Sequence, residues 1–248
     1  MKNFKLVFIL LASALFVSSC TDTKDANIWV VGTSADNPPY EQMKSGQIEG
    51  FDIDLIEAIG RHLGKDIQFK NMEFHGLLAA LTHSNVDMVL AGMSITPERQ
   101  ARVDFSIPYT GSQVTVLFRK EDDVTQMKDF SGKIVGAQLG TIWSLIASDL
   151  AGECDFKVKA LANNLMLIEE LKLKRLDAVV IEQYQAAKFI EQHPQFASFE
   201  LDKYSSSFAI ALPKNSPHKK NINHNIKSLR NNGIIEALEK KWGIIGAN

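Results

Sequence analysis

Short apolar runs alternate with amphipathic helical stretches through most of the chain, and this alternation constrains the fold more than any other feature of the sequence. In the first half we expect strands near residues 28–31, 67–70 and 86–93, with helices over 52–63 and around 77–81. Strands that are separated by helices favour a mostly parallel sheet with helices on both faces. The sequence therefore predicts an α/β fold.

A second cycle of the same kind follows, bracketed by extended segments near 112–118 and 205–212. The elements expected within it are strands at 133–137, 156–160 and 176–181, and helices at 142–150, 165–173 and 184–192. In the middle helix of this cycle, the spacing predicts that Leu165, Ile168 and Leu171 face inward.

Two cycles predict two lobes, and the two bracketing strands are expected to join them as a hinge. The final helices, around 217–231 and 233–241, have no sheet of their own, so we expect them to pack on the first lobe. Lobe 1 is then residues 28–111 plus 206–248, and lobe 2 is residues 112–205.

Residues 1–19 are typical of an export signal rather than of a folded domain. Two lysines precede an apolar run over 6–17, which is too short to span a membrane as a helix. The sequence Val-Ser-Ser-Cys that ends at Cys20 resembles the lipobox of bacterial lipoproteins, in which the cysteine is lipidated and becomes the new N-terminus. We expect a lipid anchor at Cys20, a tether over residues 20–27, and a location in the periplasm or at the cell surface.

The composition argues against several kinds of partner. The net charge is −2 and no dense run of Lys and Arg is present, which disfavours nucleic acid. The two cysteines cannot frame a disulfide scaffold or a cysteine-rich zinc site, and lipidation of Cys20 leaves Cys154 alone. We expect a monomer without a metal or another cofactor.

Four loops that follow expected strands carry the polar residues that suit a binding site. Ligands of open α/β sheets bind at the carboxyl ends of the strands. The loops are residues 32–40, 91–99, 138–141 and 182–184. They hold small residues, hydroxyl groups, an arginine, a glutamate and aromatic rings, and this set suits a free α-amino acid.

Each candidate residue has a ligand-binding and a structural interpretation. Arg99 offers a planar, bidentate donor for a carboxylate, or it is a solvated cation at the start of a helix. Glu182 accepts from an ammonium group, or it caps the following helix. Ser94 and Thr141 offer backbone N–H groups or are N-caps. Phe74 either covers the ligand side chain or packs in the core.

An ordered set of short segments over roughly residues 28–243 is more specific than any one of its members. The segments are Gly32-Thr33, Gly50-Phe51-Asp52-Ile53-Asp54-Leu55, residues 91–100, Asp104-Phe105-Ser106, Leu139-Gly140-Thr141, Leu176-Asp177-Ala178-Val179 and residues 233–242. In order and spacing they resemble the family 3 extracellular solute-binding proteins, which are receptors of ABC importers for polar amino acids. The resemblance implies the two-lobed periplasmic-binding-protein fold of type II, a Venus flytrap with a two-strand hinge that closes on its ligand.

The resemblance also implies roles for residues of lobe 1. Arg99 falls on the arginine that binds the ligand carboxylate, and Ser94 falls on its hydroxyl partner. Ala91 and Gly92 fall on backbone contacts, and Phe74 falls on the aromatic residue beside the ligand side chain.

Lobe 2 and the first loop follow the family pattern less closely. Thr141 and Gln138 lie in the loop that touches the carboxylate end, and Glu182 stands where the family usually has the aspartate that holds the ammonium. Ser34 stands where many binders of basic amino acids have an acidic residue, and Asn37 stands where an aromatic ring normally faces Phe74. These departures affect the side-chain specificity rather than the fold.

The overall similarity leans toward arginine binders, so arginine or another basic or polar amino acid is the expected ligand and an ABC permease the expected partner. Asp36 or Glu41 offers the missing negative charge, although the resemblance places neither on the ligand.

The alternative function is enzymatic, because cyclohexadienyl dehydratases, which act on prephenate or arogenate, are similar to this family. Such chemistry needs a general acid, for which Glu182 and His75 are candidates. The sequence has no zinc-protease, serine-hydrolase or nucleotide-binding motif, so we expect a binding protein rather than an enzyme.

Overall fold

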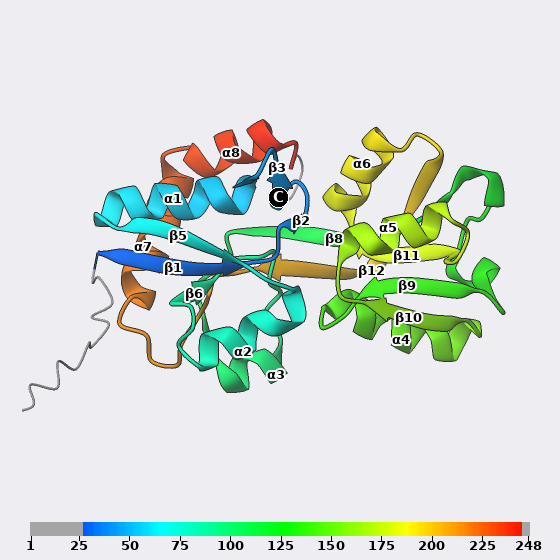
Figure 1. Ribbon diagram of the computed structural model, residues 1–248, viewed down its shortest axis with the longest axis horizontal. Coiled ribbons are helices and arrows are strands. Elements are labelled where there is room, and N and C mark those ends of the chain that lie inside the picture. Colours follow the sequence, from blue (N-terminus) through cyan, green and yellow to red (C-terminus); the bar gives the residue numbers. More distant parts are fainter. Residues whose placement is uncertain (1–26, 245–248) are drawn as a thin grey trace, which may run out of the picture.

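The computed structural model describes residues 27–244, and no helix within that range is long and apolar enough to cross a membrane. The predicted signal segment, Cys20 and all but the last residue of the predicted tether lie outside the described residues. Two five-stranded sheets lie side by side, each covered by helices, and form two lobes (Figure 1).

The sheet of lobe 1 has the order β5-β1-β6-β13-β7. Its strands are β1 (Ile28–Thr33), β5 (Asp66–Asn71), β6 (Met88–Val89), β7 (Asp104–Phe105) and β13 (Ala211–Leu212). The strands β5, β1 and β6 are parallel, while β13 runs antiparallel to β6 and β7. The strand β6 is shorter than the predicted strand at 86–93, because the chain leaves the sheet in a turn at Gly92, whose φ is +51°.

The sheet of lobe 2 has the order β10-β9-β11-β8-β12. Its strands are β8 (Thr110–Arg119), β9 (Ile134–Gln138), β10 (Lys157–Leu161), β11 (Ala178–Glu182) and β12 (Phe196–Phe208). The strands β10, β9 and β11 are parallel, and β8 pairs antiparallel with β11 and β12. Figure 1 shows β8 and β12 running together from one lobe to the other.

The helices follow the predicted periodicity closely. Those of lobe 1 are α1 (Phe51–Leu63), α2 (Leu77–Thr82), α3 (Pro97–Arg102), α7 (Lys219–Asn231) and α8 (Ile234–Trp242). Those of lobe 2 are α4 (Ile142–Cys154), α5 (Asn164–Lys172) and α6 (Gln183–Gln192). The helices α7 and α8 pack against α1, which buries Leu55, Ile56 and Ile59 as the spacing predicts.

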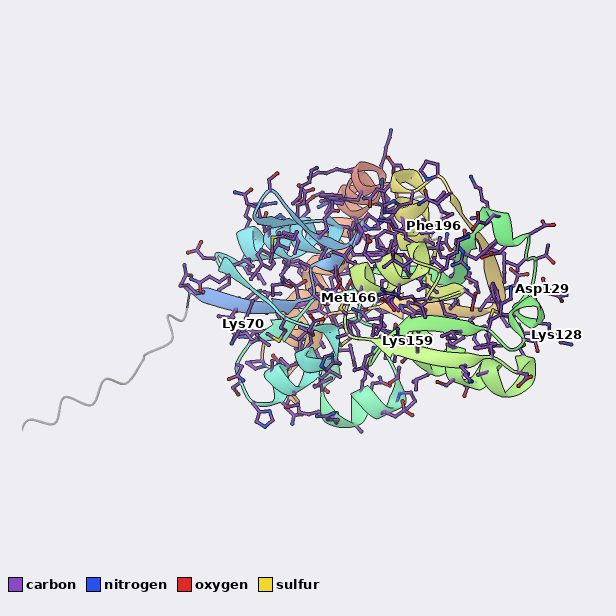
Figure 2. All side chains as sticks on the ribbon, turned by 45° about the vertical axis from the view of Figure 1, so that its right-hand side comes forward. Lys70, Lys128, Asp129, Lys159, Met166 and Phe196 are labelled. Atoms are coloured by element: carbon purple, nitrogen blue, oxygen red, sulfur yellow. The ribbon has the colours of Figure 1, made fainter. Side chains whose placement is uncertain are left out.

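The inward face of α5 is the exception. Leu167, Ile168 and Leu171 are buried, but Leu165 is half exposed, so its predicted inward orientation is wrong. Leu165 lies in the first turn of the helix, before the buried face begins. Figure 2 shows the neighbouring Met166 on the side of lobe 2 that is nearer to lobe 1, whereas Asp129 lies at the far end of lobe 2.

A small antiparallel sheet and three 3₁₀ turns complete the described chain. The sheet consists of β2 (Asp36–Asn37), β3 (Glu41–Lys44) and β4 (Gln47–Glu49). The turns are η1 (Phe74–Gly76), η2 (Lys120–Asp122) and η3 (Met127–Phe130). The β2 strand and η1 belong to lobe 1 and lie at the face that meets lobe 2.

Candidate functional site

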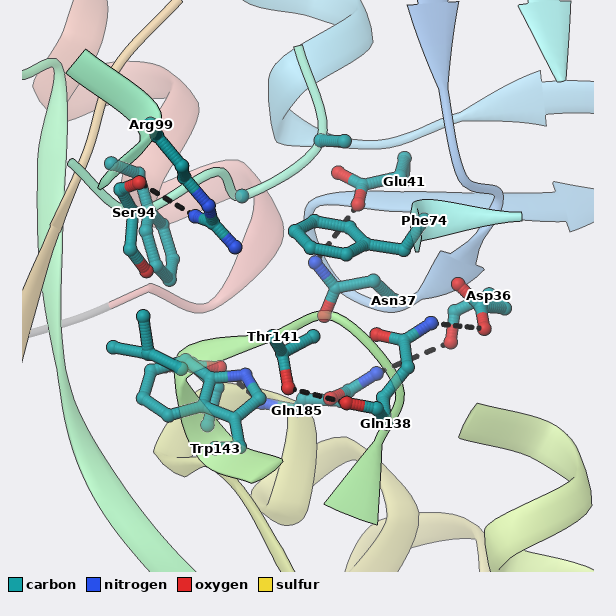
Figure 3. A pocket seen from close by; sticks show the side chains of 15 residues that line it. Asp36, Asn37, Glu41, Phe74, Ser94, Arg99, Gln138, Thr141, Trp143 and Gln185 are labelled. Atoms are coloured by element: carbon teal, nitrogen blue, oxygen red, sulfur yellow. Dashed lines mark hydrogen bonds between the residues drawn. The ribbon is translucent and has the colours of Figure 1, made fainter. Parts of the chain in front are cut away.

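A pocket lies between the lobes, near the carboxyl ends of β1, β6, β9 and β11 (Figure 3). The closed lobes leave free space in it for about one water molecule. Its lining from lobe 1 consists of Asp36, Asn37, Glu41, Phe74, Ala91, Gly92, Ser94 and Arg99, and Phe208 lines it from the end of the connecting strand β12. Its lining from lobe 2 consists of Gln138, Thr141, Ile142, Trp143, Glu182 and Gln185.

The structure brings the sequence-predicted site residues together here, with one exception. Ser34 is buried beside the pocket rather than in its lining, and its hydroxyl donates to Asp36 Oδ1 at 3.0 Å. Sequence reasoning missed Ile142, Trp143, Gln185 and Phe208. Ile142 and Trp143 directly follow Thr141 in the first turn of α4, so extending the strand-end loops by one helical turn finds them.

Arg99 is buried, so the solvated interpretation of this residue is wrong. Its Nη1 donates to Ser94 O at 2.6 Å and its Nη2 to Gly140 O at 2.9 Å, and its Cζ lies 5.4 Å from the centre of the Phe74 ring. Burial lowers the pKa of Arg99 to about 10. Within residues 27–244, no acidic side chain forms an ion pair with this guanidinium. A buried cation without an anionic partner is costly, so this site favours an anionic ligand group.

The glycine at position 92 allows the first loop to approach closely. A Cβ atom there would lie 2.8 Å from Asn37 Nδ2, and φ is +51°. The Asn37 amide donates to Glu41 Oε1 at 2.9 Å, and Gly92 N donates to Asp52 Oδ2 at 2.8 Å. Ser94 lies further along this loop, where its hydroxyl accepts from Ser206 at 2.7 Å.

Glu182 is buried, lines the pocket and caps α6, which confirms the capping interpretation, while its binding of a ligand ammonium group stays a prediction. Its carboxylate accepts from Gln185 N at 2.7 Å, from the Ser112 hydroxyl, and from the Tyr40 hydroxyl of lobe 1 at 3.3 Å. Burial raises the pKa of Glu182 to about 7. Thr141 caps α4 in a similar way, accepting from the amide of the first turn at 3.3 Å.

Two further acidic side chains, those of Glu41 and Asp52, lie next to one another and are fully buried in lobe 1. Asp52 Oδ2 accepts from Gly92 N and from the Tyr109 hydroxyl, each at 2.8 Å. The two carboxyl groups hydrogen-bond to one another, and Glu41 Oε2 and Asp52 Oδ1 have no other donor among the described residues. Burial and the neighbouring Asp52 raise the pKa of Glu41 well above its usual range, and burial raises that of Asp52 to about 6. The two carboxyl groups therefore interact by sharing a proton.

The lobes are closed over the pocket. Arg99 of lobe 1 donates to Gly140 of lobe 2, and the Tyr40 hydroxyl donates to Glu182. At Gly140, where φ is +81°, a Cβ atom would lie 2.9 Å from the Cβ of His75. Only a glycine allows this approach of the two lobes. Among residues 27–244 no cluster of three His, Cys, Asp or Glu side chains is placed to hold a metal ion.

Comparisons with known proteins agree with this geometry. The family model of bacterial extracellular solute-binding proteins, family 3, matches residues 29–245. The arginine-binding extracellular protein ArtP of Bacillus subtilis is 34% identical over 86% of this chain and 85% of its own. A probable histidine-binding protein of Campylobacter jejuni is 32% identical over 98% of this chain and 99% of its own.

Solved structures give the same result. An ancestral arginine-binding protein bound to arginine superposes with a TM-score of 0.83 at 34% identity, over 89% of this chain and 99% of its own. The ancestral amino acid-binding protein AncCDT-1, a precursor of cyclohexadienyl dehydratase, has a TM-score of 0.80 at 31% identity, over 87% and 95% of the two chains. The predicted two-lobed α/β fold and the resemblance are thus confirmed, and the chain belongs to the family 3 bacterial extracellular solute-binding proteins.

Proposed function

We propose that the protein captures a free amino acid with a cationic side chain, arginine first, outside the cytoplasm and delivers it to an ABC importer. Relatives described as arginine-binding proteins support this ligand. The observation that carries the proposal is the buried guanidinium of Arg99, which has carbonyl groups and an aromatic ring around it but no anion.

The ligand carboxylate binds Arg99 in this proposal. The N-terminus of α4, where Ile142 and Trp143 line the pocket, adds the favourable end of a helix dipole. The ligand ammonium binds Glu182, whose carboxyl is half protonated near neutral pH when the site is empty. An arriving cation favours the ionised form.

The cationic side chain of the ligand binds the pair formed by Glu41 and Asp52. The sequence left Asp36 and Glu41 open as the source of the negative charge. Asp36 already accepts three hydrogen bonds, while Glu41 Oε2 has no partner among the described residues other than the proton shared with Asp52. A guanidinium or ammonium group supplies N–H donors that take the place of this shared proton. Asn37 orients Glu41 through the hydrogen bond to Oε1.

Titration calorimetry of the purified protein, unfolded and refolded to remove any bound ligand, tests this function. Arginine is expected to bind most tightly, followed by lysine, histidine and glutamine. Arg99→Ala is expected to abolish binding of all of them, because removing one partner of a buried charge pair costs about 3–5 kcal/mol. Near-normal affinity in that variant would contradict the assignment of the carboxylate site.

The enzymatic alternative rests on the likeness to AncCDT-1 and on the carboxyl of Glu182, which burial keeps half protonated near neutral pH. Incubation with prephenate or arogenate distinguishes the two functions. Under our proposal neither compound is consumed, whereas consumption that Glu182→Gln abolishes would make the protein a dehydratase.

We also propose lipid anchoring at Cys20 and a division into lobes at residues 28–111 plus 206–248 and 112–205. The lipobox-like sequence supports the anchor. Cys20→Ala is expected to move the protein from the membrane fraction to the soluble fraction of the bacterial envelope. Size-exclusion chromatography of the soluble variant is expected to give a monomer.

A further inference from the structure

We propose that Asp36 is a closure residue: its carboxylate, on β2 of lobe 1, completes the N-terminus of helix α5 on lobe 2 and thereby stabilises the closed form whichever amino acid is bound. This inference rests on the proposed function, because it concerns the affinity of the same pocket. It assigns Asp36 to the closing movement rather than to recognition of the ligand side chain.

The hydrogen bonds of Asp36 cross from one lobe to the other (Figure 3). Its Oδ2 accepts from Asn164 N at 2.6 Å and from Gln138 Nε2 at 3.0 Å, both in lobe 2. Its Oδ1 accepts from Ser34 of its own lobe at 3.0 Å. Asp36, Gln138 and Asn164 are each at most 4% exposed, so these are buried contacts with a charged acceptor. Hydrogen bonds of this kind are about twice as strong as neutral ones.

The first turn of α5 shows why its N-terminus needs an acceptor from outside. The N-cap residue Asn163 accepts from Leu165 N at 2.9 Å, which leaves the N–H of Asn164 without a partner in its own helix. Asp36 supplies that partner from the other lobe. The negative charge also lies at the positive end of the helix dipole.

Two further contacts fix Asp36 between the lobes. The Gln138 amide that donates to Asp36 also accepts from Asn164 Nδ2 at 3.0 Å, so the end of β9 and the start of α5 are joined at this point. From α6, Gln185 Nε2 donates to the backbone O of Asp36 at 3.2 Å. Three elements of lobe 2 thus converge on a single residue of lobe 1.

These contacts do not depend on the ligand side chain. The three donors occupy most of the hydrogen-bonding capacity of the carboxylate. When the lobes separate, Asp36 and Asn164 N must take water as their partner instead. A residue that stabilises only the closed form increases the affinity for every ligand by the same factor, because it increases the population of the binding-competent state.

The first test compares Asp36→Ala with Asp36→Asn in the purified protein at pH 8, since burial raises the pKa of Asp36 to about 6 and the group is ionised at that pH. Asp36→Ala is expected to weaken the binding of arginine and of glutamine equally, by about tenfold or more, because it removes both hydrogen bonds from lobe 2 to the charged carboxylate. Asp36→Asn keeps an acceptor for Asn164 N and is expected to restore most of the affinity. If both variants lost affinity for arginine but kept their affinity for glutamine, the proposal would be overturned, and Asp36 would instead recognise the charge of the ligand side chain.

The second test removes the donor instead of the acceptor. Asn164→Pro deletes the N–H at the first helical position, where proline is well tolerated, and Asn163 already has the extended φ of −128° and ψ of 135° that proline requires before it. The matched control Asn164→Ala removes the side chain and keeps the N–H. Small-angle scattering of the ligand-free and arginine-bound protein is expected to show a more open average form for the proline variant than for the alanine variant.

The two tests together separate the possible failures. In the double variant with Asp36→Ala, Asn164→Pro is expected to add little, because both changes remove the same contact. The closure role would be overturned if Asn164→Pro and Asn164→Ala changed the affinity and the average openness equally. It would also be overturned if the losses of affinity in the double variant were fully additive. Absence of amino acid binding by the unmutated protein would instead overturn the proposed function.

Discussion

The cleft contains two acidic regions that differ in how many hydrogen bonds their carboxylate oxygens accept from the rest of the protein. Asp36 accepts from lobe 2 and from Ser34, whereas Glu41 Oε2 and Asp52 Oδ1 have no partner among the described residues other than the proton that the two carboxyl groups share. A carboxylate that the protein itself satisfies is suited to holding two parts of the fold together. A pair of carboxyl groups that lacks further donors from the protein is suited to a ligand whose N–H groups supply those hydrogen bonds.

The local backbone produces this difference. Asp36 lies in β2 at the face toward lobe 2, where the N-terminus of α5 meets it. Glu41 begins β3 and Asp52 lies in the first turn of α1, so both are enclosed within lobe 1. Among residues 27–244, only Asn37, Gly92 and Tyr109 donate to this pair from outside it.

Among the changes that test this comparison, the largest effect is expected from Glu41→Gln, which keeps the shape of the pair but prevents Glu41 from ionising when a cation binds. Affinity for arginine is expected to fall about a hundredfold, because a buried hydrogen-bonded charge pair is worth about 2–5 kcal/mol. Affinity for glutamine is expected to change little. Calorimetry with both ligands measures the ratio.

Asp36→Asn is the matched control, since it neutralises the other acidic region. If Asp36→Asn changes the ratio of arginine to glutamine affinity more than Glu41→Gln does, the assignment of the cationic side chain to Glu41 and Asp52 is wrong.

Gly140→Ala is expected to have the next largest effect, through closure alone. The new Cβ atom would lie 2.9 Å from the Cβ of His75, so the lobes cannot close fully, and all ligands are expected to bind about tenfold more weakly. The strain of φ +81° adds about 1 kcal/mol to the cost of folding.

Gly46→Ala is a control that separates the backbone strain of a positive φ from the steric clash between the lobes. Gly46 has φ +80° and nothing within 4 Å of its added Cβ, so this variant is expected to lose stability but to keep its affinity. Equal affinity losses in the two variants would mean that Gly140 acts through backbone strain rather than through the approach of the lobes.

The sequence predicts the strand-end residues of the pocket better than its acidic regions, for a physical reason. Loops at the ends of parallel strands must meet, so the sequence places Arg99, Thr141 and Glu182 in one pocket. The partners Gln138 and Asn164 of Asp36 are 102 and 128 residues away, and no local pattern indicates which loops of two lobes touch after closure.

Asp52 illustrates a second limit. An acidic residue in the first turn of a helix is usually explained by the helix dipole, and no local pattern indicates that Asp52 pairs with Glu41. The pairing depends on burial, which α1 and the β3 strand create only when they pack together. Lobe packing and buried charge are therefore the parts of the site that periodicity and spacing do not contain.

The smallest expected effect is a difference in proton release between two ligands. Burial and Asp52 raise the pKa of Glu41, so its proton is held when the pocket is empty and is displaced by a cationic side chain. Arginine affinity is therefore expected to rise with pH more steeply than glutamine affinity, by no more than about tenfold per pH unit for one proton. Glu182 releases protons with both ligands, so the difference isolates the pair. Calorimetry in two buffers of different ionisation enthalpy counts the protons, and equal release by both ligands, or a difference that survives Glu41→Gln, would place the cation outside the pair.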